Sequence, residues 1–552
     1  MTTPAPAALL TRLEATRFSY GSGWPERKID LLTQLDRAHL RTVAQVVRMH
    51  ELLCVMRAYP DNVDVLVKTE KLLARFGRRA DLASYKDRLA DSGIAGTDIR
   101  YRFFWPTARW LAARWSDRLV IEWDQIDDQA ALTAALPVLV TPIESSWLRV
   151  LKPSPKKALA RLATNTTEAT FFVRAVEAMP GNDFTREAFY DSVGLPLILR
   201  ASRETPSRTM AHYSGVKVNF PTAAPIASRP NLRAELDRSP RTIRTVSSKE
   251  GSELIDLARE AMVCRGRDLD AFAYGDPNDV RLIDDGDGLA WAMMGIVPER
   301  RPILRAAYGY LILRNGVPVG YVQSDTLWKS VDLAFNTFAT FRGIEAAVVL
   351  GRTMAMLRHL FDAASFTLEP YQLGDGNDEG LASGAWWFYY RLGFRPRNAR
   401  VRALARAELE RMKHKGGHRS SATTLATLAK DYLYFEWSGV RAPRWPRLAA
   451  LGSEVGRGLS QQRAEAVGSA PHPLAKVADG ELRRATPPEL RAWASWTPIV
   501  SLMPGLEQWT DDEKLDLVKI ILAKGGPRDT DYLRLFDRHP KLGDALREQT
   551  GA

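Results

Sequence analysis

The chain of 552 residues contains only two cysteines, Cys54 and Cys264, which lie far apart in the sequence. They offer neither a disulfide framework nor the spacing of a metal site. The eight histidines are scattered, and no metal is expected. The patterns Gly-x-Ser-x-Gly, His-Glu-x-x-His and Gly-x-x-x-x-Gly-Lys are absent. These absences exclude the commonest serine hydrolases, zinc peptidases and phosphate-loop nucleotide hydrolases.

Long apolar runs are also missing. No segment approaches 18 uninterrupted apolar residues, so no membrane span is expected. The residues after Met1 lack the basic region and apolar core of a signal peptide, which predicts a cytoplasmic location. The net charge of +12 is modest for this length and is compatible with nucleic acid, coenzyme A or an acidic protein surface as partner.

Length and pattern predict an α+β protein of several domains. Residues 1–150 are expected to form a mainly helical domain, because apolar residues recur at helical spacing between turns rich in Gly and Asp. Prolines punctuate residues 151–239, a predicted helical and irregular connection. Residues 240–400 are expected to form a mixed sheet with helices packed on it. Residues 401–552 are expected to form a basic helix and a helical C-terminal region. Within the last region, residues 441–490 are rich in Pro, Gly and Arg and are expected to be partly irregular.

Two polar patterns near residue 110 have alternative interpretations. Tryptophans at 105, 110 and 115 alternate with arginines and would suit the stacking of nucleic-acid bases. A buried helix followed by a strand explains them better, so nucleic acid as a partner is unsupported. The acidic residues around Asp128 would suit a divalent metal, but a cap for the helix that follows is the preferred interpretation.

The stretch from Leu304 to Arg397 is the most informative part of the chain. Two apolar runs flank Asn315-Gly316, the dipeptide that best fits a tight type I′ turn, and predict a β-hairpin. A further strand is expected over 331–338, and a helix behind Arg342-Gly343 reaches Phe361. A short strand over 365–369, a loop and an aromatic helix complete the series.

This order of elements resembles the core of the GNAT superfamily of N-acetyltransferases, over roughly residues 240–400. One motif is the turn Arg342-Gly343-Ile344-Glu345-Ala346-Ala347, which is similar to the acyl-coenzyme A signature of that family. The other consists of Ala385, Tyr389, Gly393 and Phe394, which match its closing pattern. The turn departs from the signature at Glu345, where a glycine is usual and where a carboxylate is expected to repel phosphate. The asparagine usual before the second motif is Ala382 here.

The resemblance implies direct transfer of an acyl group to an amine. The donor would be acetyl-CoA, a longer acyl-CoA or an acyl-carrier thioester, and the acceptor amine is not identified. Tyr389 would protonate the departing thiolate. Asp268 is the candidate base, with Asp270 as an alternative and Cys264 as a candidate nucleophile. The residues expected to bind the donor are Phe335, Asn336, Phe338, Arg342, Gly343, Ala347 and Asn377.

The alternative hypothesis is a non-catalytic GNAT-like fold within a helical scaffold that binds protein or nucleic acid. A working donor site predicts a pocket beside Phe335 and Phe338. A scaffold predicts that side chains such as Trp328 or Trp386 fill the same region.

Overall fold

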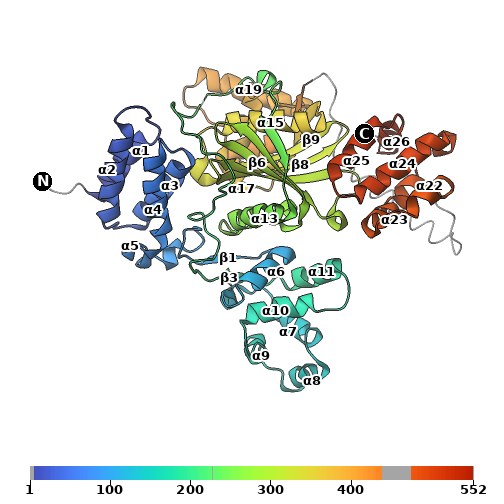
Figure 1. Cartoon of the computed structure of the whole chain (residues 1–552), viewed down its shortest axis with the longest axis horizontal. Coiled ribbons are helices and arrows are strands. Elements are labelled where there is room, and N and C mark those ends of the chain that lie inside the picture. The colour runs from blue at the N-terminus through green and yellow to red at the C-terminus, as the bar shows by residue number, and fades with distance from the viewer. Residues whose placement is uncertain (1–4, 227, 438–473, 551–552) are drawn as a thin grey trace.

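The computed structural model describes residues 5–226, 228–437 and 474–550. It is an α+β structure in which a nine-stranded sheet lies at the centre and three mainly helical parts surround it (Figure 1). None of the helices in these ranges has the length and apolar content needed to cross a membrane.

The N-terminal part is a bundle of helices with a continuous apolar core. Its helices are α1 (Pro6–Thr16), α2 (Trp24–Arg37), α3 (Val43–Ala58), α4 (Val63–Ala74) and α5 (Ala80–Ala83). The leucines of α2 are buried, as their helical spacing predicts, whereas α3 is buried on all sides from Leu52 to Ala58. A buried ion pair between Lys28 and Asp61, 2.7 Å apart, ties α2 to the turn before α4.

A second unit has its own apolar core, built around a three-stranded sheet in the order β1-β3-β2. Its elements are β1 (Ile99–Tyr101), α6 (Trp105–Arg114), β2 (Leu119–Ile121), α7 (Gln129–Ala135), α8 (Pro142–Leu151), α9 (Pro155–Leu162), α10 (Glu168–Glu177), α11 (Asp183–Val193) and β3 (Leu197–Leu199). The predicted boundary at residue 150 falls inside this unit, because β3 pairs with both earlier strands. The helix-then-strand interpretation of residues 101–123 is confirmed, and Asp128 caps α7 as predicted.

The central sheet has the strand order β11-β12-β10-β9-β8-β7-β6-β5-β4. Its strands are β4 (Thr242–Thr245), β5 (Gly275–Gly286), β6 (Leu289–Ile296), β7 (Ala306–Arg314), β8 (Val317–Leu327), β9 (Ser330–Thr337), β10 (Ser365–Leu368), β11 (Arg395–Pro396) and β12 (Leu433–Glu436). The predicted hairpin is confirmed, since Asn315 and Gly316 join β7 to β8 with φ of 49° and 76°. β12 follows the predicted end of this domain at residue 400 and nevertheless lies inside the sheet.

Helices cover both faces of the sheet, with α13 and α15 on opposite sides (Figure 1). The helices of this part are α12 (Leu232–Glu235), α13 (Ser248–Val263), α14 (Asp270–Ala273), α15 (Ala346–Phe361), α16 (Pro370–Leu373), α17 (Asp378–Ser383), α18 (Ala385–Arg391), α19 (Ala399–His414) and α20 (Ala422–Ala429). The predicted basic helix is α19, which buries Val401 and Ala405 and exposes most of its arginines.

The C-terminal part is a helical bundle on the far side of the sheet from the N-terminal helices, and it contacts β7 (Figure 1). It consists of α22 (Ala475–Leu482), α23 (Pro487–Ser501), α24 (Asp511–Lys524), α25 (Asp529–Arg538) and α26 (Leu542–Thr550). Thr510 and Glu513 form a capping box at the start of α24. The stretch predicted to be irregular is 441–490, and its residues 441–473 lie outside the described residues. Its residues 474–490 contain α22 and the first turn of α23.

Candidate functional site

Strands β9 and β10 diverge after a short parallel pairing. β10 pairs with β9 only at Ser330, Val331 and Asp332, whereas β8 pairs with β9 along its whole length. Among the described strands, none pairs with the outer edge of β9 from 333 to 337. Two central strands therefore separate beyond Asp332, and this separation is called the opening below.

The backbone of Phe335 faces this opening. Its carbonyl oxygen accepts a hydrogen bond of 3.4 Å from the hydroxyl of Tyr389, on α18. The N–H and C=O groups of one residue in an extended strand point the same way, so the Phe335 N–H also faces the opening. Tyr389 is buried, and burial raises the pKa of its hydroxyl well above the usual value. The tyrosine is therefore neutral at physiological pH, with its proton at the edge of the strand.

The turn before α15 lies at the end of β9. Gly343 adopts φ of 76°, and a side chain there would meet no atom within 4 Å, so the turn faces open space. No side chain caps the N-terminus of α15. The first N–H groups of this helix, which include that of Ala347, lack acceptors within the helix and form the positive end of its dipole. A turn of this kind suits an anionic group.

Glu345 does not carry an uncompensated charge in this turn. Its carboxylate pairs with Arg314 and accepts a hydrogen bond of 2.8 Å from the hydroxyl of Tyr59 in the N-terminal bundle. Both charged side chains of the pair are at most 13% exposed. The guanidinium of Arg314 thus offsets the repulsion of phosphate that the sequence led us to expect.

Arg342 belongs to an ionic cluster beside the turn. It pairs with Glu379, which also pairs with Arg267 at 2.5 Å. The guanidinium of Arg267 reaches the hydroxyl of Tyr321 on β8 at 3.5 Å. Arg342 keeps 41% of its side chain exposed, so its positive charge is accessible. Asn377 instead caps α17 by accepting from the Gly380 N–H, which gives it a local structural role.

The phenyl rings near the opening are packed. Phe335 and Phe338 are 8% and 2% exposed, and the Arg265 guanidinium lies 3.6 Å from the centre of the Phe338 ring. Trp386 is buried within α18, where it stacks on Tyr390. Both rings therefore belong to the core. The backbone N–H and C=O of Phe338 are bonded to Val319 and Phe341, so only Phe335 turns its backbone toward the opening.

Trp328 lies elsewhere in the molecule, beside the C-terminal bundle. Its ring packs near Gly543 and under the guanidinium of Arg547. It therefore does not fill the region beside Phe335 and Phe338.

Two residues named from the sequence hold the structure together. Asp268 accepts hydrogen bonds from the Phe104 N–H at 2.9 Å and the Thr107 hydroxyl at 2.6 Å, and so joins α6 to the central part. Burial raises its pKa to about 7. Cys264 is fully buried, and burial raises the pKa of its thiol, which makes it a poor nucleophile.

A pair of aspartates that sequence reasoning missed lies at the apex of the opening. Asp332 on β9 is directly opposite Asp325 on β8, so both point to the same face of the sheet. Burial, reinforced by the charge of Asp325, raises the pKa of Asp332 to about 7, although the Thr367 hydroxyl donates to it at 2.7 Å. One carboxylate oxygen of Asp325 is buried without a hydrogen-bond partner, while the other lies 3.0 Å from Arg305.

A cavity of about 370 Å³ opens over this face. Its lining includes Asp325, Asp270, Glu187 and the guanidinium of Arg300. Asp270, an alternative base in the sequence interpretation, is thus close to the pair that the sheet brings together. Five of the residues that line the 370 Å³ cavity also border a wider cleft of about 890 Å³ between α11 and α23. Asp325 is the member of the pair that borders the cavity, whereas Asp332 lines neither the cavity nor the cleft.

The site brings together two aspartates on one face of the sheet, a neutral tyrosine hydroxyl and an uncapped helix N-terminus. No cluster of three or more His, Cys, Asp or Glu in the described ranges is arranged to hold a metal ion. No protein-family model, curated protein or solved structure matches the chain. Function must therefore be argued from the geometry of the site.

Proposed function

We propose that the protein is an N-acyltransferase that moves an acyl group from a coenzyme A or acyl-carrier thioester directly to an amine, on a GNAT-like core. The observation that carries this proposal is the opening between β9 and β10. Three features lie one after another along β9: an unpaired strand edge, the Tyr389 hydroxyl and the uncapped N-terminus of α15.

The donor would lie along the open edge of β9. The turn at Gly343, the first N–H groups of α15 and Arg342 would hold its phosphate groups. The N–H of Phe335 would donate to the thioester oxygen, where negative charge develops during attack. The pairing of Glu345 with Arg314 supports this placement, because it offsets a charge that would oppose phosphate.

The acceptor would approach from the opposite side of the opening, over Asp325 and Asp332. Asp332 takes a proton from the amine as nitrogen attacks the acyl carbon and the carbon–sulfur bond breaks. Tyr389 gives its proton to the departing thiolate. The products are an amide and a free thiol; Asp332 then releases its proton to solvent, and a proton from solvent restores the tyrosine.

Arg342→Glu is expected to abolish saturable binding of acetyl-CoA and of a long-chain acyl-CoA to the full chain. The substitution replaces the accessible cation beside the turn by a carboxylate that also repels Glu379. Isothermal titration calorimetry measures the affinities of the two proteins for each thioester.

Arg400→Ala is a matched control, because this exposed arginine of α19 lies outside the turn. It should bind both thioesters like the unmodified chain. Equal affinity in all three proteins would contradict the proposed position of the donor. If the unmodified chain binds neither thioester nor an acylated carrier protein, the alternative of a non-catalytic scaffold that binds protein or nucleic acid takes precedence.

A further inference from the structure

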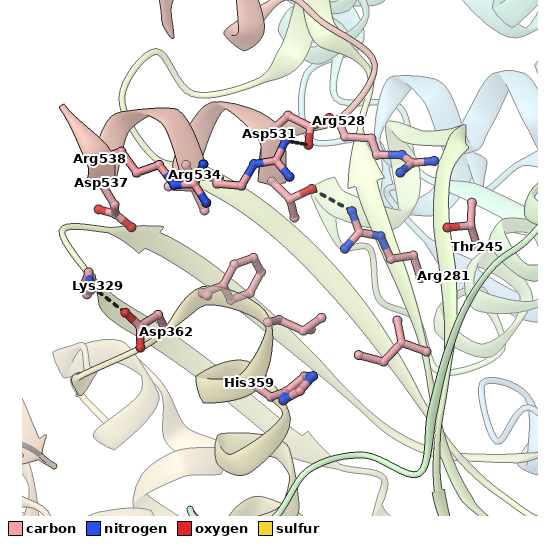
Figure 2. A pocket seen from close by; sticks show the side chains of 15 residues that line it. Thr245, Arg281, Lys329, His359, Asp362, Arg528, Asp531, Arg534, Asp537 and Arg538 are labelled. Carbon is pink, nitrogen blue, oxygen red and sulfur yellow. Dashed lines mark hydrogen bonds and ion pairs between the residues drawn. The ribbon is translucent and has the colours of Figure 1, made fainter.

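Figure 2 shows a basic cavity of about 600 Å³ beside the sheet. Strand register places it on the face opposite Asp325 and Asp332. Its floor includes Arg281 on β5, which is in register through Met293 and Tyr310 with Val322 on β8. Since Asp325 follows Val322 by three positions along β8, its side chain points to the other face. The cavity is therefore separate from the proposed acyl-transfer site.

The cavity collects more positive than negative side chains (Figure 2). The cations are Arg281, Lys329, Arg528, Arg534 and Arg538, with His359 at the rim, and the carboxylates are Asp362, Asp531 and Asp537. Two cations are neutralised within the cavity, since Lys329 lies 2.6 Å from Asp362 and Arg534 lies 3.0 Å from Asp531.

Three arginines remain without a carboxylate partner among the described residues. Arg281 donates only to the hydroxyl of Thr530, at 2.6 Å, and neither Arg528 nor Arg538 is within ion-pair distance of a described carboxylate. Asp537 is the remaining acid, and burial raises its pKa to about 6. Guanidinium groups with free donors match the oxygens of phosphate in charge and geometry.

The rest of the wall supplies a helix end and an apolar floor. The first turn of α25, a helix of ten residues without a side-chain cap, lines the cavity with Arg528, Thr530 and Asp531. The Thr530 N–H of this turn donates to the Tyr308 hydroxyl at 2.9 Å, and Asp529 and Asp531 lie in the same turn, so the arginines supply the positive charge of the cavity. Ile243, Leu360, Phe361 and Leu533 form an apolar part of the same wall. The volume is in the range of pockets for small ligands.

We infer that this cavity binds a small molecule with at least two phosphoryl groups and a ring, of the nucleoside diphosphate class. The phosphoryl groups lie against Arg281 and Arg528, and the ring lies on the apolar wall. Arg538 stands at the other end of α25, about 15 Å along the helix from Arg528, and adds positive charge there. The site differs from the turn at Arg342, because α15 separates the two. Helix α15 has 16 residues and is about 24 Å long; its first residue follows the turn and its last residue lines the cavity.

Calorimetric titration of the full chain with ADP and, separately, with inorganic pyrophosphate tests this inference. We expect saturable ADP binding that weakens at least tenfold in the double variant Arg281→Ala/Arg528→Ala and that weakens with added salt. Pyrophosphate should bind more weakly than ADP, because it leaves the apolar wall uncovered.

Two controls make the result specific. Arg483→Ala removes an exposed arginine of the same bundle that is paired with Asp479, and should leave ADP affinity unchanged. Because ADP is part of coenzyme A and would also fit the proposed donor site, the titrations are repeated in the Arg342→Glu background, where binding by this cavity should persist. No binding of either probe, or ADP binding that survives in a double variant with an unaltered melting temperature, would overturn the inference. Pyrophosphate binding as tight as that of ADP would overturn the role of the apolar wall.

Discussion

Asp332→Asn is expected to lower kcat/KM for acyl transfer to an amine by a factor of about 10² to 10⁴, the usual contribution of a general base. The amide keeps the size of the side chain and its contact with Thr367 but cannot take a proton from the acceptor. Donor affinity should change little, because the donor contacts proposed above come from Phe335, Arg342 and the start of α15. The effect should therefore appear in kcat rather than in donor binding.

The pH dependence of this reaction follows from the pKa of Asp332, which is about 7. A base works in its deprotonated form, so kcat/KM rises with pH through about 7 and levels above it. This rise should disappear in Asp332→Asn. In Asp325→Asn the rise should move to lower pH, because the charge of Asp325 helps to raise the pKa of Asp332.

Asp268→Asn provides the comparison with the base named from the sequence. Burial raises the pKa of Asp268 to about 7 as well, but its two oxygens are bonded to Phe104 and Thr107. We expect this variant to weaken the contact between α6 and the central part. It should keep the rise in kcat/KM near pH 7. Rate profiles between pH 5.5 and 9 with an acyl donor and a panel of amines decide between the two aspartates. A rise that is lost in Asp268→Asn and kept in Asp332→Asn would reverse the assignment.

Local patterns in the sequence predicted the elements around the site. The hairpin at Asn315-Gly316 and the helix behind Gly343 depend on residues close together in the chain, and both are confirmed. The predicted strand over 331–338 corresponds to β9. Turn chemistry and apolar periodicity are sufficient for such elements, because their determining contacts are short-range.

The polar part of the site depends on contacts that no local pattern encodes. Asp325 and Asp332 become neighbours through strand register, and the alternation of side chains on β8 and β9 was the only available signal. The partners of Glu345 lie 286 and 31 positions away, at Tyr59 and Arg314. The unit around β3 was missed for the same reason, since three short strands distant in sequence form its sheet. Sequence order alone cannot reveal such pairings.

Lys524→Ala is expected to destabilise the C-terminal bundle by about 3 to 5 kcal/mol, as is usual when one partner of a buried ion pair is removed. Lys524 is 4% exposed and its ammonium lies 2.8 Å from Asp529, which is 1% exposed. The ammonium also donates to the carbonyl of Arg305 at 2.7 Å, which ties α24 to the start of β7. Burial lowers the pKa of Lys524 to about 8, so the lysine is charged at pH 7 and its removal leaves Asp529 buried without a counter-ion.

Hydrogen exchange measured by mass spectrometry on peptides from α24 and α25 tests this expectation. Because each 1.4 kcal/mol is a factor of ten, exchange should accelerate by about two to almost four orders of magnitude in Lys524→Ala. Lys519→Ala removes a half-exposed lysine of the same helix, 3.4 Å from Asp516, and should change exchange by less than about tenfold. The double variant Lys524→Met/Asp529→Asn should recover much of the protection, because it removes the unpaired charge. Unchanged exchange in Lys524→Ala would show that the pair contributes little to the docking of the bundle, and equal loss in the double variant would show that the ammonium acts mainly through the Arg305 carbonyl.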